Sequence, residues 1–376
     1  MTITPKTTRA ALGVAATLVF MLATSISACS DGGPTEVRDA SEGVDHAPQF
    51  VINGKDDFDH SAVAAIMVYD PTFPPAPGWR SFCTASLIHK RVLQTAGHCV
   101  QQLEAGLAAG VLKAAWISFQ HHPQAHFNEN PAVADPATAG WYEIESIHNN
   151  PDNPDFLALF AQVFELLEQD PADRDPAAVE AVLAMWGKFH DSGVIVLKKK
   201  VREIRPMKLP VRRGEVERRL AMAGCDAQTP GCGLHVVGYG LTEFPPPPQS
   251  QTRQSALLRW KGTERLWVVS DHEPQDSEFG TVCFGDSGAP IVLVKDNGRD
   301  RMITAISSSP EDPFGVPCTG GALHYRADTE SHLAFIKGVI KSLHGSSSRR
   351  SRSAVGVDDE GRRHHAARRR GLPSRE

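Results

Sequence analysis

Short apolar runs recur along most of the chain, and Gly, Pro and polar residues separate them. Many short strands divided by turn residues are typical of a β-barrel or a β-sandwich. We therefore expect an all-β domain over residues 51–345, with exposed Pro-rich loops at 71–77 and 245–248. The predicted strands are Val63–Tyr69, Ala115–Phe119, Gly193–Leu197, Leu234–Val237, Leu266–Val269, Pro290–Val294 and Met302–Ile306.

Two segments have a helical period instead. The first, residues 155–188, interrupts the β region, and its second half begins with Asp175 as a cap and Pro176 at the first helical position. Its apolar residues at helical spacing are Val179, Val182, Leu183 and Trp186. The second segment, Ser331 to Leu343, is amphipathic. The insertion at 155–188 is either a lid or exosite, or a packed surface decoration.

The beginning of the chain has the pattern of an export signal. Lys6 and Arg9 precede an uncharged apolar run that ends at Ile26. This run is short for a membrane span, and no other stretch is as apolar. We therefore expect a protein that is exported.

The end of this run, Ile-Ser-Ala-Cys up to Cys29, resembles the lipobox of bacterial lipoproteins. The resemblance implies a signal peptide over 1–28, lipidation at Cys29 and a flexible tether or pro-segment over 29–50. The expected location is the bacterial cell envelope, with a lipid anchor, or the medium as a secreted protein. An ordinary signal peptide that leaves Cys29 free is the alternative.

Charge and cysteine usage narrow the picture further. Of the formal net charge of −5, the Arg- and Ser-rich stretch 346–376 contributes about +5, so the rest of the chain is acidic and a nucleic-acid partner is not expected. That stretch reads as a disordered tail, which either contacts anionic lipid or envelope polymer or has no partner. Without Cys29, six of the 7 cysteines remain, an even number that favours three disulfides in an oxidising compartment.

Three stretches carry residues suited to catalysis: Thr95-Ala-Gly-His98-Cys99, His190-Asp191-Ser-Gly-Val-Ile-Val-Leu197 and Cys283-Phe-Gly-Asp-Ser287-Gly-Ala-Pro290. A serine hydroxyl is a poor nucleophile unless a neighbouring base takes its proton, and an imidazole can do so near neutral pH. A buried carboxylate fixes the tautomer of that imidazole and stabilises its cation. Glycine beside the serine lets backbone N–H groups approach a developing oxyanion.

The order of these residues is His98, Asp191, Ser287, which is the order of chymotrypsin. The chain resembles the trypsin/chymotrypsin-like serine proteases, in their bacterial secreted or lipoprotein branch, over about residues 51–343. The resemblance implies two six-stranded antiparallel β-barrels, at about 51–205 and 206–330, with a helical insertion in the first and a C-terminal helix after the second. It also implies that His98 is the general base, Asp191 its orienting carboxylate and Ser287 the nucleophile, with the N–H groups of Gly285 and Ser287 as the oxyanion hole.

The same resemblance implies two of the disulfides and a substrate pocket. Cys83 would pair with Cys99 and Cys283 with Cys318, and the remaining Cys225 and Cys232 would then close a small local loop. The pocket would be formed by Thr281, Ser307, Ser309 and Gly321. Because Thr281 stands where trypsin-like members have Asp, we expect a small or medium neutral residue before the scissile bond rather than Arg or Lys.

The start of the domain, Phe50-Val51-Ile52-Asn53-Gly54, resembles the activation site of the family. Cleavage between Phe50 and Val51 would free an ammonium group that pairs with Asp286, because an unpaired buried carboxylate there would be costly.

The sequence thus predicts a monomeric serine endopeptidase that acts on protein or peptide substrates through an acyl-enzyme and needs no cofactor. Two alternatives stay open: a non-catalytic binding or adhesion protein on the same fold, and an esterase. No metal is expected, because the histidine groups His121, His122 and His126, and His364 and His365, lack Cys or acidic ligands at a clear spacing.

Overall fold

The computed structural model describes residues 52–72, 78–124, 136–226, 232–241, 252–273, 278–294, 302–315 and 318–354, with backbone alone from 344. The predicted signal peptide, tether, lipidation position Cys29, Val51, the loop 245–248, His126, His364, His365 and the tail beyond 354 lie outside these residues. The chain forms two compact units, residues 1–335 and 336–376. Within the described ranges, no helix is long and apolar enough to cross a bilayer.

The first barrel is closed by six antiparallel strands in the order β2-β3-β4-β7-β6-β5. The strands are β2 (Val63–Asp70), β3 (Gly78–His89), β4 (Val92–Thr95), β5 (Ala114–Ser118), β6 (Tyr142–Asn149) and β7 (Gly193–Leu197). Their inward side chains, among them Ile66, Leu87, Leu93, Ile117 and Ile195, are fully buried. Burial of these alternating apolar positions stabilises the barrel and fixes the register of its strands.

The second sheet has the order β1-β9-β8-β12-β13-β14-β11-β10. Its strands are β1 (Lys55–Asp56), β8 (Leu234–Gly238), β9 (Gln254–Leu257), β10 (Arg259–Thr263), β11 (Trp267–Asp271), β12 (Pro290–Leu293), β13 (Ile303–Pro310) and β14 (Ala322–Arg326). Only Leu258 separates β9 from β10, although β10 lies at one end of the order and β9 lies next to the other end. The sheet must therefore curl until its ends meet, with β9 and β10 as one bent strand.

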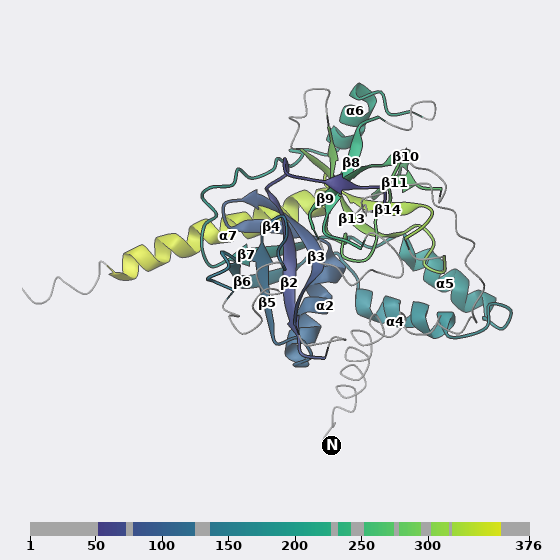
Figure 1. Ribbon diagram of the computed structural model, residues 1–376, viewed down its shortest axis with the longest axis horizontal. Helices are drawn as coiled ribbons and strands as arrows, with labels where there is room; N and C mark the ends of the chain where they lie inside the picture. The colour runs from purple at the N-terminus through teal and green to yellow at the C-terminus, as the bar shows by residue number, and fades with distance from the viewer. Residues whose placement is uncertain are drawn as a thin grey trace, which may run out of the picture. The chain divides into compact units, whose positions relative to one another are not determined.

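If β9 and β10 count as one strand and the short β1 is left out, the second sheet is a six-stranded barrel, as the sequence predicts. β1 is the exception to the predicted division, because this N-terminal segment pairs with β9 of the second barrel. The all-β architecture of two barrels is confirmed, and it is that of the chymotrypsin fold (Figure 1).

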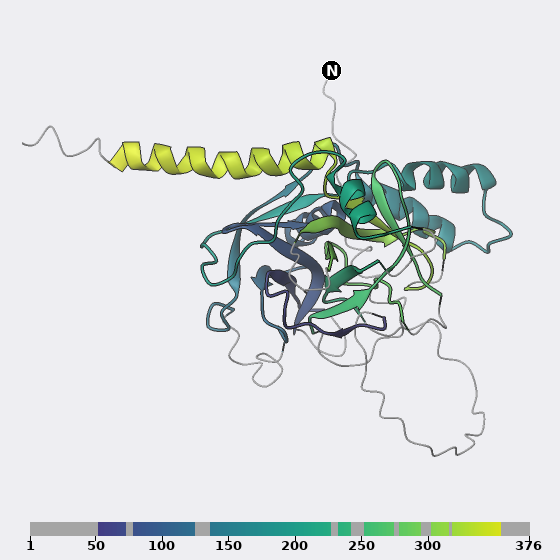
Figure 2. The ribbon, with the colours of Figure 1, turned by 90° about the horizontal axis from the view of Figure 1, so that it is seen from above.

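Within residues 52–335, the helices α2 (Gly97–Ala108), α4 (Phe156–Leu167), α5 (Pro176–Trp186) and α6 (Glu215–Met222) lie around the barrels rather than inside them (Figures 1 and 2). A further helix, α7 (Glu330–Ala354), begins after β14. The insertion is the pair α4 and α5, and the side chains of Asp155 and Asp175 cap the two helices as N-caps by accepting backbone N–H bonds. α7 starts close to the predicted Ser331 but runs to Ala354, into the stretch that the sequence reads as a disordered tail.

Candidate active site

Strand pairing in the first barrel brings His98 and Asp191 together. β4 pairs with β7, with Thr95 opposite Gly193. His98 lies in the first turn of α2, directly after β4, and Asp191 lies two residues before β7 begins. The two residues therefore leave neighbouring strand ends at the same side of the barrel.

Two hydrogen bonds join this pair. The Nδ1 atom of His98 lies 2.8 Å from Asp191 Oδ2, and the His98 backbone N–H donates to Asp191 Oδ1 at 2.8 Å. Asp191 is fully buried and His98 is only 6% exposed. A third bond comes from Ser308 on β13, whose hydroxyl donates to Asp191 Oδ2 at 2.6 Å.

The surroundings of Asp191 keep it ionised. Burial alone would raise its pKa, but the charge and hydrogen bonds of His98, with the Ser308 bond, bring the pKa below its ordinary value. A carboxylate at Nδ1 favours the imidazole tautomer that carries its proton on Nδ1 and leaves the Nε2 lone pair free. His98 is therefore held in the form that a general base requires.

Ser287 lies in the turn before β12, and this turn rests on the first barrel through Thr84 of β3. The Thr84 N–H donates to the Ser287 carbonyl at 2.8 Å, and its hydroxyl donates to the Gly285 carbonyl at 2.8 Å. Gly288 has a φ of 86°, and a Cβ at this position would lie 2.2 Å from the Thr84 carbonyl. Only glycine permits both this conformation and this approach of the two backbones.

The turn reaches the segment that carries His98. Cys99, the next residue, has its Sγ atom 3.6 Å from the Ser287 carbonyl oxygen. Across the described residues, neither the Ser287 hydroxyl nor His98 Nε2 has a hydrogen-bond partner. The structure thus assembles the three predicted residues in one region but hydrogen-bonds only two of them. Bonds between base and nucleophile commonly form or tighten only when substrate is present.

The backbone around Ser287 leaves two donors unused. The N–H groups of Gly285 and Ser287 have no acceptor among the described residues, whereas the next N–H, of Gly288, donates to Ser307 at 2.8 Å. Gly285 has a φ of 98°, a conformation that glycine adopts without strain. Two free N–H groups beside a serine are the chemistry of an oxyanion hole.

Asp286, between these donors, is a buried carboxyl group without a cationic partner among the described residues. Burial raises its pKa to about 7, and the N–H groups of Cys283 at 3.0 Å and Gly240 at 2.9 Å oppose that rise. Ile52 forms a β-bridge with Thr281. The predicted partner of Asp286, Val51, is outside the described residues.

The predicted pocket residues occupy different environments. Thr281 is buried in its bridge with Ile52, and Ser309 is buried on β13. Ser307 pairs with Ala289 and Gly288 inside the sheet, so its backbone serves the barrel. A Cβ at Gly321 would lie 2.0 Å from a carboxylate oxygen of Glu311, whose side chain also bonds Lys261 at 2.6 Å.

The three disulfides have the predicted pairings, Cys83–Cys99, Cys225–Cys232 and Cys283–Cys318. The first anchors the start of α2 to β3, and the third joins the Ser287 turn to the chain before β14. Cys83, Cys99 and His98 lie close together, but a disulfide has no thiolate to bind a metal, so this group is not a metal site.

Three residues at the site were not predicted: Ser308, Phe156 and Trp186. The Phe156 ring stacks on the His98 ring with centroids 4.7 Å apart and planes 30° apart. The Trp186 indole N–H donates to the Pro310 carbonyl on β13 at 2.9 Å. The insertion therefore contacts both the imidazole and the strand that carries Ser308.

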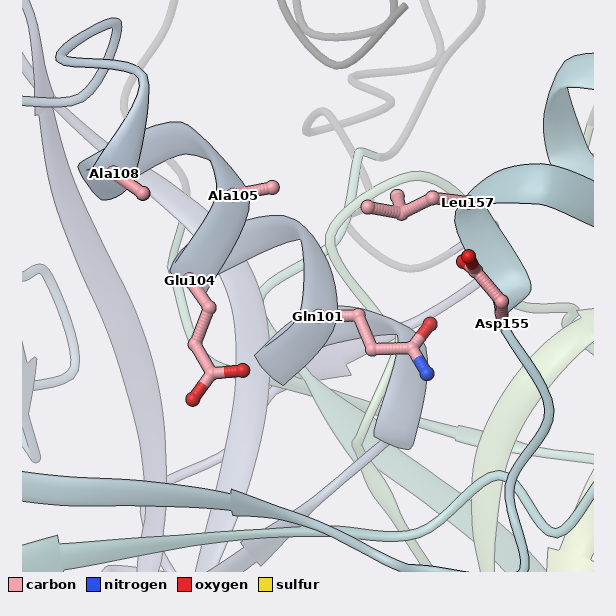
Figure 3. A pocket seen from close by; sticks show the side chains of 6 residues that line it. All are labelled: Gln101, Glu104, Ala105, Ala108, Asp155 and Leu157. Carbon is pink, nitrogen blue, oxygen red and sulfur yellow. The ribbon is translucent and has the colours of Figure 1, made fainter. Parts of the chain in front are cut away.

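A depression of about 550 Å³ opens beside this region, between α2 and the start of α4 (Figure 3). It is lined by Gln101, Glu104, Ala105, Ala108, Asp155 and Leu157. Neither His98 nor Ser287 lines it, so a substrate bound there would not meet the predicted base or nucleophile. Its lining residue Gln101 instead fixes the start of α4, since its amide donates to the Pro154 carbonyl at 3.0 Å and accepts from the Phe156 N–H at 2.9 Å.

Fold and site together define the class: a chymotrypsin-type double barrel with a buried His–Asp pair and a serine on a glycine-flanked turn. No family profile matches the chain, and no curated protein sequence matches it. Among solved structures, human heparin binding protein matches with 14% identity over 77% of this chain and 97% of its own, at a TM-score of 0.45.

Two further solved structures match at a comparable level. A protein described as HL collagenase has 14% identity over 77% of this chain and 99% of its own, at a TM-score of 0.46. Neuropsin, a serine protease expressed in the limbic system of mouse brain, has 14% identity over 77% of this chain and 100% of its own, at a TM-score of 0.43. Similarity of this degree carries no argument about this chain, so its activity is inferred from its own residues.

Proposed function

We propose that the protein is a serine endopeptidase that cleaves peptide bonds through an acyl-enzyme intermediate. The observation that carries the proposal is the bidentate bond of buried Asp191 to His98, in the region where Gly285 and Ser287 keep free N–H groups. A protein that only binds a partner has no need of a buried ionised carboxylate behind an imidazole.

The mechanism follows from these groups. His98 Nε2 takes the proton of the Ser287 hydroxyl as its oxygen attacks the substrate carbonyl, and Asp191 stabilises the resulting imidazolium. The Gly285 and Ser287 N–H groups stabilise the oxyanion. His98 then gives the proton to the leaving amine, which leaves Ser287 as an ester of the substrate. Water hydrolyses this ester: His98 takes a proton from the attacking water and returns it to the Ser287 oxygen as the acid product leaves. No cofactor enters, and the substrate is a protein or peptide bound by a monomer.

Activation and export belong to the same proposal. Cleavage between Phe50 and Val51 would supply a cation for Asp286. The Ile52–Thr281 bridge supports this, because it ties Ile52, the residue after Val51, to the segment that leads into the Ser287 turn. Three disulfides support an oxidising compartment, outside the cytosol. Lipidation at Cys29 and the bacterial envelope are proposed from the sequence pattern.

The test is covalent labelling with a fluorophosphonate, which reacts with an activated serine. We expect labelling of Ser287 in the processed protein and loss of labelling in Ser287→Ala and His98→Ala. Absence of labelling in processed, folded protein would leave a binding protein as the better description. Casein digestion compared with hydrolysis of short esters then separates a peptidase from an esterase.

A further inference from the structure

Among the described residues, no strand pairs with β13 on its β12 side beyond Ser307, so this edge is open there. β12 pairs with β13 only as far as Pro290 opposite Ile306, with the adjoining Ser307–Ala289 bond, while β14 continues along the other side. Ser308, next on β13, bonds Asp191, so this open edge starts beside the His–Asp pair. An extended peptide can add to such an edge by backbone hydrogen bonds, antiparallel to β13.

Pro310 is the next residue that faces this open side. The Glu311 N–H donates to Gly321 on the β14 side at 2.8 Å, and successive residues of a strand direct their backbone groups to opposite sides. A substrate residue opposite Pro310 would need an N–H donor and a free carbonyl. Proline has no N–H, and its carbonyl already accepts the Trp186 indole N–H at 2.9 Å.

Phe156 closes the neighbouring space. Its ring lies against the face of the His98 imidazole at 4.7 Å between centroids, so no substrate side chain can occupy that face. Phe156 is 3% exposed and also packs on Phe160 and Phe189.

The helices that present these residues are held at both ends. Gln101 bonds the chain on both sides of Asp155 at the start of α4, and Trp267 of β11 donates its indole N–H to the Gly187 carbonyl just after α5 at 2.8 Å. Trp186 itself is 2% exposed. With these bonds and this burial at both ends, α4 and α5 form a fixed wall beside β13 rather than a loosely attached loop.

We propose that Trp186, Pro310 and Phe156 are specificity-determining residues that end substrate recognition two residues before the scissile bond. This rests on the proposed function. We place the residue before the scissile bond opposite Ser308, because Ser308 bonds Asp191 of the His–Asp pair; in antiparallel pairing the residue two positions upstream of it then lies opposite Pro310. The third residue upstream of the scissile bond therefore has no backbone partner on β13. The enzyme acts on chains with little ordered structure upstream of the cut, such as peptides cleaved close to their N-terminus.

The test uses acetylated alanine p-nitroanilides with one to four residues before the scissile bond. For the processed wild-type enzyme, kcat/KM should rise from one residue to two and change less than about twofold from two to four. The double variant Trp186→Phe, Pro310→Gly frees the carbonyl and adds an N–H while keeping an aromatic ring. Its kcat/KM should rise about tenfold or more when the third residue is added, as two new hydrogen bonds permit.

Trp141→Phe is the matched control. It removes another buried indole N–H, which bonds the Gln120 side-chain oxygen at 3.3 Å in the first barrel, and it should leave the length dependence as in the wild type. A tenfold gain from the third residue in the wild type, or no gain in the folded double variant, would overturn the proposal.

Calorimetry measures the affinity of the Ser287→Ala protein for acetylated alanine amides of the same lengths. These affinities should rise from one residue to two and change little from two to four. This readout separates the two proposals. If processed protein is not labelled by the fluorophosphonate and hydrolyses none of the series, the peptidase fails, while the affinities still decide whether the edge of β13 stops accepting chain at Pro310.

Discussion

Asp286 should make the unprocessed protein less stable as the pH rises. The carboxyl has an ordinary pKa of 3.8, and burial raises it to about 7 in the folded chain. Below about pH 4 it is protonated in both folded and unfolded chains and costs nothing. As the pH rises, the unfolded chain loses this proton first, so the free energy of unfolding falls between about pH 4 and 7. At about 1.4 kcal/mol per pKa unit, the total loss is about 4 kcal/mol.

The measurement is urea unfolding of the unprocessed Ser287→Ala protein from pH 4 to 8, compared with the same protein carrying Asp286→Asn. The inactive background prevents self-cleavage, and the difference between the two proteins cancels the titration of all other groups. Asp286→Asn should be the more stable of the pair at pH 8 by up to about 4 kcal/mol relative to their difference at pH 4. Equal pH slopes would refute the reasoning. Processing at Val51 should also flatten the slope, because an ammonium partner favours the ionised carboxyl.

Two further predictions concern the site and its frame. Asp191→Asn places an amide N–H₂ opposite His98 Nδ1 and so reverses the tautomer of the imidazole, and kcat on a peptide anilide should fall by about 10⁴. Ser308→Ala removes only one of three bonds to Asp191 and should lower kcat by about tenfold. Equal losses in the two variants would contradict these roles. Replacing Cys225 and Cys232 by serine should reduce the free energy of unfolding by about 2 kcal/mol in denaturant titrations and leave kcat unchanged, since the disulfide joins residues outside the candidate site. A matching loss of kcat would show that this loop supports the site.

Sequence patterns identify elements where local chemistry and burial agree. β7 has the predicted bounds because Gly193–Leu197 is an uninterrupted apolar run that is buried on both faces. α5 starts at Pro176 because the cap and the proline fix the helix start independently of tertiary contacts. β1 could not be found in this way, because its two residues, Lys55 and Asp56, are exposed and owe their conformation to pairing with β9.

The role of Ser308 shows why site residues are harder to predict than strands. Three successive serines, Ser307, Ser308 and Ser309, are alike in sequence, and which of them faces Asp191 depends on strand register. The pairing of β13 with β14 shifts between Ser307 and Ser309, so the simple alternation of side chains fails there. Sequence spacing carries no signal for such a bulge.

The contacts of Phe156 and Trp186 depend on docking that is still further from sequence. Both residues look like ordinary apolar positions of amphipathic helices, and most of their surface is indeed buried in a hydrophobic cluster. Their contacts with His98 and Pro310 arise because Gln101 fixes one end of the insertion and Trp267 the other. Since Gln101 lies one turn after His98 on α2, the helix that positions the base also positions the wall beside it. A substitution in that wall can therefore change catalysis as well as specificity. The dependence of kcat/KM on substrate length isolates the effect on specificity, whereas the absolute value of kcat/KM does not.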